Sequence, residues 1–313
     1  MKKALKITVI TILLLAALAM LGLSYYTGRS AFKGICETVS REQTLENQSY
    51  YTDEYKKFAA NNKPVEIMIP SRQNDSGIPA LYVEKPESKG VAVLIHGMGG
   101  TKKSSYRMMR NFLDLGYSVI SYDQRNSGDN TAPYNTCGVL ESIDALDVVD
   151  FARENLLNSG KLILWGESYG GATAAIAAGR DDSGIDCLIL ESPMGRGIDM
   201  FKTVAKEYAG EAGIPLSYIT FCADVYMKIK LGFGFKEMDP SAWIKSTSKP
   251  VLISNSSIDE LVPLYMGEEI YEAVGHEKKR IFTNDKYGHA EFPSKDPRGY
   301  KRLIEEFIKD FRA

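Results

Sequence analysis

The sequence predicts an α/β protein with a mostly parallel, doubly wound sheet, a helical cap insertion and an N-terminal hydrophobic helix. The sheet is predicted by short apolar runs of strand type that alternate along the chain with segments of helical periodicity. The N-terminal helix is predicted by a long uncharged stretch close to the first residue. Roughly 250 residues remain after this stretch, which is enough for one large domain with a sizeable core.

The N-terminal segment has the pattern of a membrane anchor. Three lysines within the first six residues precede Ile7–Leu23, a run of seventeen residues without a charge. Seventeen residues is the lower limit for a helix that spans a bilayer, and the basic residues before it favour an orientation with the N-terminus inside. A cleaved signal peptide is the alternative, because Ala17–Ala19 resembles a cleavage site. We expect residues 1–27 to be a signal anchor in the cell membrane, and the rest of the chain to lie outside the cytoplasm, or to be secreted if the segment is cleaved.

Composition limits the possible partners and cofactors. The chain is 44% hydrophobic and 25% charged, with a formal net charge of −2, so we expect no nucleic-acid partner. Four cysteines permit disulfides but include no C-x-x-C pair, and no H-E-x-x-H motif occurs. We therefore expect neither a metal nor a cofactor. The sequence does not predict the oligomeric state. The cysteines are Cys36, Cys137, Cys187 and Cys222.

Residues 28–63 form either a linker or a short helix. Tyr51, Tyr55 and Phe58 fall at helical spacing, which favours a helix that packs on the following domain. A loose stalk between the membrane and the domain is the alternative, and both interpretations remain open from the sequence.

The predicted domain covers residues 64–313 and opens with a hairpin. Glu66–Ile69 and Ala80–Val83 flank the turn-rich Asn74–Gly77. Strands and helices then alternate. Further strands are expected near 91–95, 118–122, 161–165, 186–190, 250–254 and 279–283, and helices near 104–115, 140–156, 169–178, 261–274 and 298–311.

Residues 193–245 interrupt this alternation. The segment is rich in large apolar residues, including Phe201, Tyr208, Phe221 and Tyr226. We expect a cap of helical segments that roofs a pocket, with some of these side chains packing the cap and others lining the cavity.

A serine at the apex of a strand–turn–helix motif is the candidate nucleophile. Gly166-Glu167-Ser168-Tyr169-Gly170 follows the apolar run Lys161–Trp165 and precedes a stretch of small residues. The two glycines suit a sharp turn, because a side chain at either position would meet the neighbouring strand and helix.

A serine hydroxyl needs a base, and the chain has three histidines. His289 follows the last predicted strand and is the candidate base, whereas His276 lies in a polar loop. Asp259, which follows the preceding strand, is the candidate acid that would orient the imidazole, and it can also cap the next helix. The rival acids are Glu191, Glu260 and Asp285.

The order Ser168, Asp259, His289, with the His96-Gly97-Met98 loop after an earlier strand, resembles the α/β-hydrolase superfamily over residues 64–312. The resemblance is closest to bacterial serine hydrolases of the esterase/lipase and prolyl-oligopeptidase-like branches. It implies a small ester or acyl substrate cleaved through an acyl-enzyme. It also implies an oxyanion site made by the backbone N–H groups of Met98 and Tyr169, and a structural role for His96.

Three other activities compete with an esterase. A peptidase or amidase of this fold usually carries an additional β-propeller, for which the residues before the domain are too few. A non-catalytic binding protein would be expected to lack a triad member, and acyl transfer to an alcohol or amine is open. A phosphate-binding loop at Gly97–Ser104 is a separate alternative. The sequence disfavours it, because Lys102 occupies a position where that motif requires glycine.

The segment Asp123–Gly128 also resembles a segment of the superfamily, with Asn126 in place of its usual glycine. We expect Asp123 and Arg125 to form a structural ion pair. Lys102 and Lys103 are expected at the mouth of the site or in solvent.

Overall fold

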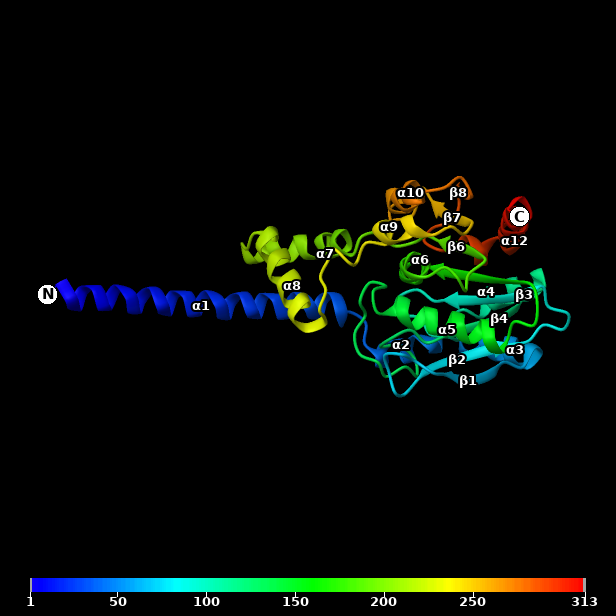
Figure 1. Ribbon diagram of the computed structural model, residues 1–313, viewed down its shortest axis with the longest axis horizontal. Coiled ribbons are helices and arrows are strands. Elements are labelled where there is room, and N and C mark those ends of the chain that lie inside the picture. The colour runs from blue at the N-terminus through cyan, green and yellow to red at the C-terminus, as the bar shows by residue number, and fades with distance from the viewer. Residues whose placement is uncertain (1, 312–313) are drawn as a thin grey trace. The chain divides into compact units, whose positions relative to one another are not determined.

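One sheet of eight strands organises the computed structural model, which describes residues 2–311 (Figure 1). The strands lie in the order β1-β2-β4-β3-β5-β6-β7-β8. The first two form an antiparallel hairpin, β2 is also antiparallel to β4, and every other neighbouring pair is parallel. The strands are β1 (Val65–Ile69), β2 (Ile78–Val83), β3 (Gly90–Ile95), β4 (Ser118–Tyr122), β5 (Lys161–Glu167), β6 (Cys187–Glu191), β7 (Val251–Ser256) and β8 (Lys279–Asn284).

The central strands are buried on both faces, which explains their continuous apolar sequences. Every residue of β3 is buried, and so is the apolar part of β5. Because the strands from β3 onward are parallel, their carboxyl ends and the loops that follow them gather at one edge of the sheet. The predicted fold class, a mostly parallel doubly wound sheet, is therefore confirmed.

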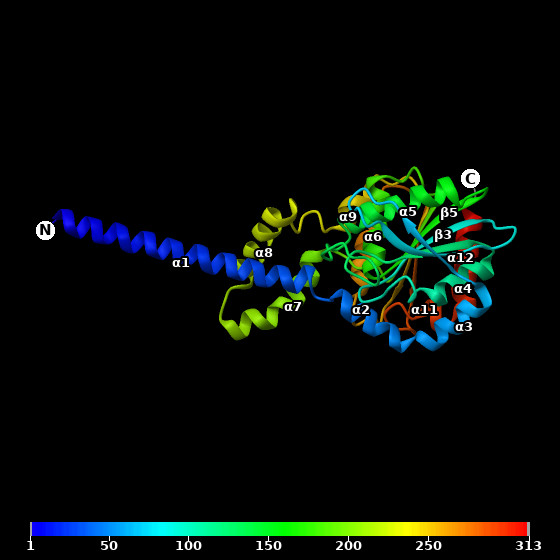
Figure 2. The same cartoon turned by 90° about the horizontal axis from the view of Figure 1, so that it is seen from below.

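Helices cover both faces of this sheet (Figure 2). Two 3₁₀ turns, at Gln48–Tyr50 and Ile244–Ser246, accompany them. The helices are α2 (Arg41–Asn47), α3 (Thr52–Asn62), α4 (Tyr106–Leu115), α5 (Glu141–Asn155), α6 (Tyr169–Arg180), α9 (Pro240–Trp243), α10 (Leu264–Ala273), α11 (Phe292–Lys295) and α12 (Pro297–Asp310).

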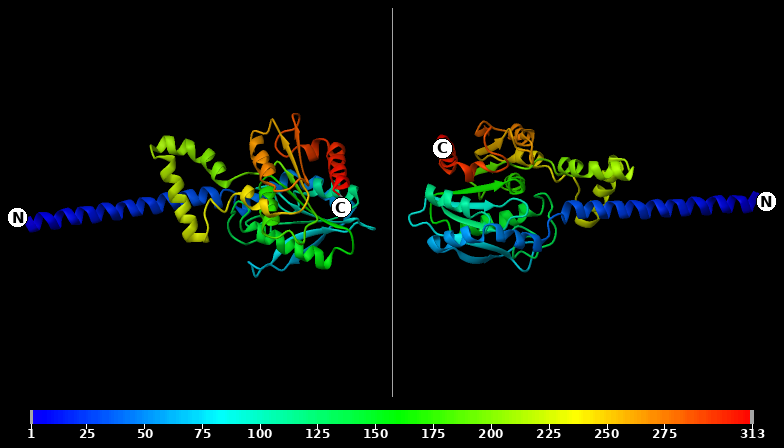
Figure 3. Two further views of the ribbon diagram at one scale, coloured as in Figure 1. Left: turned by 45° about the horizontal axis from the view of Figure 1, so that its top comes forward. Right: turned by 180° about the vertical axis from the view of Figure 1, so that it is seen from behind.

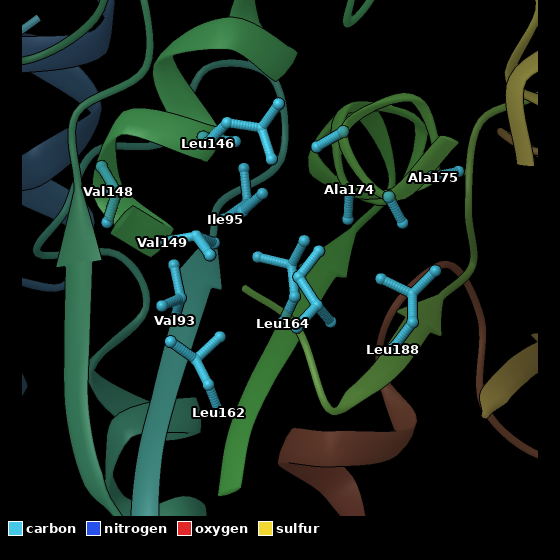
Figure 4. Close-up of a cluster of buried hydrophobic side chains, with 14 of the residues drawn as sticks. Val93, Ile95, Leu146, Val148, Val149, Leu162, Leu164, Ala174, Ala175 and Leu188 are labelled. Carbon is cyan, nitrogen blue, oxygen red and sulfur yellow. The ribbon is translucent and has the colours of Figure 1, made fainter. Parts of the chain in front are cut away.

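On one face, α5, α6 and α10 pack on the sheet. Val149 from α5 and Ala174 from α6 join Val93 and Leu164 in one buried cluster (Figure 4). The small residues of α6 allow its axis to lie close to β5, and this proximity holds the first turn of α6 against the end of that strand.

On the other face, α3, α4 and α12 pack on the sheet. Phe58, Phe112 and Phe307 from these helices join Trp165 of β5 in the second buried cluster. Phe58 is fully buried, so the segment around it is a packed helix and not a loose stalk.

A second compact unit combines the residues before Val39 with Ile198–Glu237. It contains α1 (Lys2–Cys36) together with most of α7 (Gly197–Ala212) and all of α8 (Leu216–Leu231). Both views of Figure 3 show α1 as one continuous helix. The predicted boundary at residue 27 therefore falls inside α1. No proline, which would end or kink a helix, occurs in the sequence before Pro64. The ends of the predicted insertion, 193–197 and 238–245, belong to the unit that contains the sheet.

Candidate active site

Ser168 occupies a sharp turn between β5 and α6. Its backbone has φ 53° and ψ −118°, which is a strained conformation for a residue with a side chain. The flanking glycines make the turn possible. A Cβ at Gly166 would lie 2.2 Å from the carbonyl oxygen of Gly170, and a Cβ at Gly170 would lie 2.3 Å from that of Ile95. The turn therefore presents the Ser168 side chain at the carboxyl edge of the sheet.

The loop after β3 approaches this serine. A Cβ at Gly97 would lie 3.5 Å from Cβ of Ser168. His96 is buried beside it, and burial lowers the pKa of its imidazole. Its Nε2 accepts a hydrogen bond from the backbone N–H of Gln124, so Nδ1 carries the proton and donates to the carbonyl oxygen of Gly97 at 2.7 Å. His96 thus organises the loop as a neutral side chain.

Met98 and Tyr169, the two residues whose amides are expected to form the oxyanion site, line one small hollow together with Gly97. Tyr169 begins α6, directly after Ser168, where a helix N-terminus favours negative charge. Its buried hydroxyl donates to Glu141 at 2.8 Å and accepts from the backbone N–H of Cys137 at 3.0 Å. These bonds fix the first turn of the helix.

The structure brings His289 and Asp259 into direct contact. Nδ1 of His289 lies 2.7 Å from Oδ2 of Asp259, whose side chain is almost fully buried. The other oxygen, Oδ1, accepts the backbone N–H groups of Leu261 and Val262 at 2.9 and 2.8 Å. Burial alone would raise the pKa of Asp259, but these hydrogen bonds together lower it below its usual value. An ionised carboxylate can only accept hydrogen bonds, so Nδ1 of His289 is the donor and Nε2 is left as the basic nitrogen.

The helix that follows Asp259 begins at Leu264, three residues later than predicted. Asp259 orders the turn before the helix with one oxygen and contacts His289 with the other, but it does not cap the helix, because Pro263 occupies the N-cap position of α10.

Backbone hydrogen bonds connect the loops that carry these groups. The N–H of Ser168 donates to the carbonyl oxygen of Glu191 at 2.9 Å, and the N–H of Met194 donates to that of Ser168 at 3.0 Å. The N–H of Ala290, next to His289, donates to Oγ of Ser192 at 3.2 Å. Within residues 2–311 the Ser168 hydroxyl makes no hydrogen bond to His289. The structure thus joins His289 to Asp259, and brings Ser168 to the same edge of the sheet.

The rival acids differ from Asp259 in their surroundings. Glu260 and Asp285 are exposed. Glu191 is buried at the end of β6, where burial raises its pKa to about 8. It is therefore largely protonated at neutral pH and cannot stabilise an imidazolium as a carboxylate does.

Glu167 lies beside the candidate site, and the sequence did not single it out. Its Oε1 accepts the N–H of Gly97 in a long hydrogen bond of 3.4 Å. The pKa of Glu167 is raised above its usual value, because the effect of burial outweighs the hydrogen bond from Gly97 and the nearby His289, both of which lower it. The only sequence signal was its position, because it directly precedes the candidate serine.

The ion pair expected between Asp123 and Arg125 does not form. Nζ of Lys102 pairs with Asp123 at 2.7 Å with both side chains buried, and Arg125 pairs with Asp144. Lys102 is thus neither at the mouth of the site nor in solvent, because Asp123 compensates its charge inside the protein. Asn126 adopts a φ of 53°, which asparagine tolerates better than most residues, and so it replaces the glycine.

No group of three or more His, Cys, Asp or Glu side chains in the described part of the chain could hold a metal ion. The thiols of Cys137 and Cys187 are buried, and burial raises the pKa of each to about 12.

Known proteins share this sequence pattern and this architecture. A family model described as the alpha/beta hydrolase fold matches residues 91–211. The uncharacterized protein YqkD of Bacillus subtilis is 27% identical over 232 residues, which cover 74% of this chain and 75% of that protein. The lysophosphatidylserine lipase ABHD12 of Xenopus tropicalis is 26% identical over 235 residues, covering 70% of this chain but only 51% of that protein.

Among solved structures, the Pyrococcus furiosus esterase Pf2001 superposes with a TM-score of 0.62 at 20% identity, covering 82% of this chain and 96% of the esterase. At that identity the likeness concerns the fold alone. The sheet order, the family match and the structural likeness agree: the chain has the α/β-hydrolase fold and resembles members of that superfamily in sequence.

Proposed function

We propose that this chain is a serine hydrolase that cleaves carboxylic esters through an acyl-enzyme, with Ser168 as nucleophile, His289 as base and Asp259 as the orienting acid. The α/β-hydrolase fold and the likeness to an esterase and a lipase support hydrolase activity in general. The observation that carries the finer proposal is the 2.7 Å contact between His289 and the amide-held carboxylate of Asp259.

In the first half-reaction, Oγ of Ser168 attacks the ester carbonyl carbon while Nε2 of His289 takes the hydroxyl proton. The carbonyl oxygen becomes an oxyanion, to which the backbone N–H groups of Met98 and Tyr169 donate hydrogen bonds. The carboxylate of Asp259 stabilises the imidazolium without taking its proton. The C–O bond to the leaving alcohol then breaks, and His289 returns the proton to that alcohol.

In the second half-reaction, His289 removes a proton from water, whose oxygen attacks the acyl carbon. A second oxyanion forms in the same place. Its collapse releases the carboxylic acid and returns the proton to Ser168, so the enzyme is regenerated without a metal or a cofactor.

The N-terminal helix is proposed to hold the enzyme in the membrane as an uncleaved anchor, with the hydrolase domain outside the cytoplasm. Among residues 2–311, α1 is the one helix long and apolar enough to cross a bilayer. Its apolar residues are exposed, which fits a helix surrounded by lipid.

Turnover of matched esters and amides tests the proposed reaction. Full-length protein in detergent should hydrolyse p-nitrophenyl acetate and butyrate, and should hydrolyse the corresponding anilides far more slowly. Ser168→Ala should lower kcat by about 10³-fold or more, whereas Ser183→Ala, at an exposed position, should leave kcat unchanged. Preferential cleavage of amides would replace the esterase by a peptidase, and a folded protein that cleaves neither would indicate a binding role.

A further inference from the structure

The insertion between β6 and β7 packs against the N-terminal helix inside the unit that the two form together. The two helices approach closely at Gly28 of α1, because a Cβ there would lie 2.5 Å from the carbonyl oxygen of Cys222 and 2.9 Å from Cβ of Tyr226 in α8. The ring of Tyr226 also contacts those of Tyr25 and Phe32, with centroids 5.6 and 5.4 Å apart. Glycine therefore allows α8 to lie directly on α1, and Figures 1 and 2 show the two helices crossing.

This contact begins where the apolar segment of α1 ends. Oγ of Ser24, the first residue after Ile7–Leu23, lies 2.8 Å from the hydroxyl of Tyr218 near the start of α8. A helix of seventeen residues is about 26 Å long, which is close to the thickness of the hydrocarbon core. If the segment crosses a bilayer, Ser24 and Tyr218 mark the level of its outer surface.

One face of α8 is apolar and is not covered by any residue that the structure describes. Phe221, Val225 and Ile229 are 65%, 38% and 81% exposed, and their four-residue spacing places them in one row along the helix. Ile219, Ala223 and Met227, at the same spacing, are buried. The helix therefore has two apolar rows, of which only one is used in packing.

The neighbouring helix α7 repeats this pattern. Val204 and Tyr208 are 74% and 55% exposed, again four residues apart, while Phe201, Ala205 and Ala209 are buried. Large apolar side chains exposed in rows on two helices that follow one another in the chain are unusual for segments that face only water.

We propose that this unit is a membrane-contacting element, in which the exposed row Phe221, Val225 and Ile229 lies in the interfacial layer of the bilayer that α1 crosses. The occupant is the lipid surface, because the contact of Ser24 with Tyr218 already places the start of α8, next to Phe221, at the level where the bilayer ends. A second protein would have to be recruited, whereas the lipid is present wherever α1 is inserted. The inference rests on the proposed anchoring by α1, and it deepens the proposed function by holding the hydrolase at a surface where amphiphilic esters concentrate.

Quenching by brominated lipid tests the contact directly. Phe221→Trp in full-length protein, reconstituted into phosphatidylcholine vesicles, is compared with the same protein in vesicles whose acyl chains carry bromine. The emission of Trp165 and Trp243 is subtracted with the wild type. We expect roughly a twofold loss of the added emission, because an interfacial side chain lies within about 5–10 Å of the acyl boundary.

Glu37→Trp is the matched control, since Glu37 is exposed and follows α1 thirteen residues beyond Ser24, which is about 20 Å along a helix. Its added emission should be unaffected by bromine. Equal quenching at the two positions, or none at position 221, would overturn the proposal. So would an emission change at position 221 that depends on protein concentration and not on bromine, because a second copy would then cover the row.

A second pair of variants tests whether α1 positions α8. In the Phe221→Trp background, Gly28→Leu should abolish the difference between brominated and plain lipid. Gly34→Leu should preserve this difference, because a Cβ added at Gly34 would have no atom of another segment within 4 Å. Quenching that survives Gly28→Leu would overturn the claim that α1 holds α8 at the surface.

The same samples separate this inference from the proposed reaction. Fluorophosphonate labelling reports the serine, alkaline carbonate extraction reports anchoring by α1, and bromine quenching reports the α8 contact. Quenching without labelling would refute the hydrolase mechanism alone, whereas labelling and anchoring without quenching would refute the membrane-contacting element alone.

Discussion

The side chains of Asp259 and His289 lie 2.7 Å apart although 30 positions separate them in the chain. The parallel pairing of β7 with β8 accounts for the contact, because Ser256 and Asn284 are partners at the ends of these strands. Beyond the ladder, the backbone N–H of Ser257 donates to the carbonyl oxygen of Asn284 at 2.9 Å. The two loops therefore leave the sheet side by side, and the geometry of the sheet brings Asp259 to His289.

Asp259→Asn tests the role of this contact. The asparagine side chain can donate through its amide, so it can hold the imidazole in the wrong tautomer while preserving the fold. We expect kcat for ester hydrolysis to fall by about 10³–10⁴-fold with little change in thermal stability.

Glu260→Gln is the control for that variant, because it changes the neighbouring, exposed carboxylate. It should retain wild-type kcat. A loss of activity in Glu260→Gln comparable to that in Asp259→Asn would assign the effect to the loop and not to the pair.

Glu191 makes stability depend on pH. Burial raises its pKa from 4.5 to about 8 in the folded protein, and the carboxylates of Glu167 and Asp259 act in the same direction. Between these values the folded protein keeps a proton that the unfolded chain releases, so this group lowers the free energy of unfolding as pH rises from 4.5 to 8. Glu191→Gln should therefore gain Tm relative to wild type as pH rises through that range.

The measurement is the difference in Tm between the two proteins at several pH values, which cancels the contribution of other groups. A difference in Tm that stays constant from about pH 5 to about pH 8, where the folded and unfolded states are expected to differ in the protonation of Glu191, would mean that Glu191 is ionised in the folded protein.

The glycines of the turn at Ser168 should be intolerant of even one methyl group. Gly170→Ala places a Cβ 2.3 Å from the carbonyl oxygen of Ile95 and 2.6 Å from that of His96, so the backbone must shift. We expect a loss of about 1–3 kcal/mol in the free energy of unfolding and a marked loss of kcat.

Gly210→Ala is the matched substitution in a helix. A Cβ added at Gly210 would have no atom of another segment within 4 Å. It should be neutral or slightly stabilising, by up to about 1 kcal/mol, because alanine has the higher helix propensity. Denaturant unfolding measures the free energy of unfolding of both variants. Equal values for the two would show that the turn at Ser168 can relax to accept the methyl group.

The pair of Lys102 and Asp123 should contribute strongly to stability. Lys102→Met leaves a buried carboxylate without its cation, which is expected to cost about 3–5 kcal/mol in the free energy of unfolding. Lys103→Met, at the adjacent, partly exposed position, should cost less than about 1 kcal/mol. If the two variants unfold at the same denaturant concentration, the Lys102 side chain is exposed to solvent and is not buried with Asp123.

The parts of the fold that follow from local pattern were predictable from the sequence. Strand-type runs such as Val91–Ile95 and the glycines around Ser168 determine where strands end and where a sharp turn forms. The order of Ser168, Asp259 and His289 follows from a sheet whose loops emerge at one edge. These features depend on residues close together in the chain, or on a topology that is repeated along it.

Features that depend on contacts between distant segments could not be read in this way. Lys102 pairs with Asp123 because two loops meet, and nothing in the spacing distinguishes Lys102 from Arg125 as the cation that pairs with Asp123. The contact of Gly28 with Cys222 joins helices nearly two hundred residues apart. Glu167 was missed because its surroundings come from Gly97 and His289 and not from its neighbours in sequence.

Fluorophosphonate labelling of the full-length protein, with the modified residue located by peptide mass spectrometry, tests whether Ser168 is a nucleophile activated by His289. We expect covalent labelling at Ser168 in the wild type, none in Ser168→Ala, and labelling slowed by about 10³-fold or more in His289→Ala. Labelling at another serine, or labelling of Ser168 at the wild-type rate without His289, would rule out the proposed mechanism.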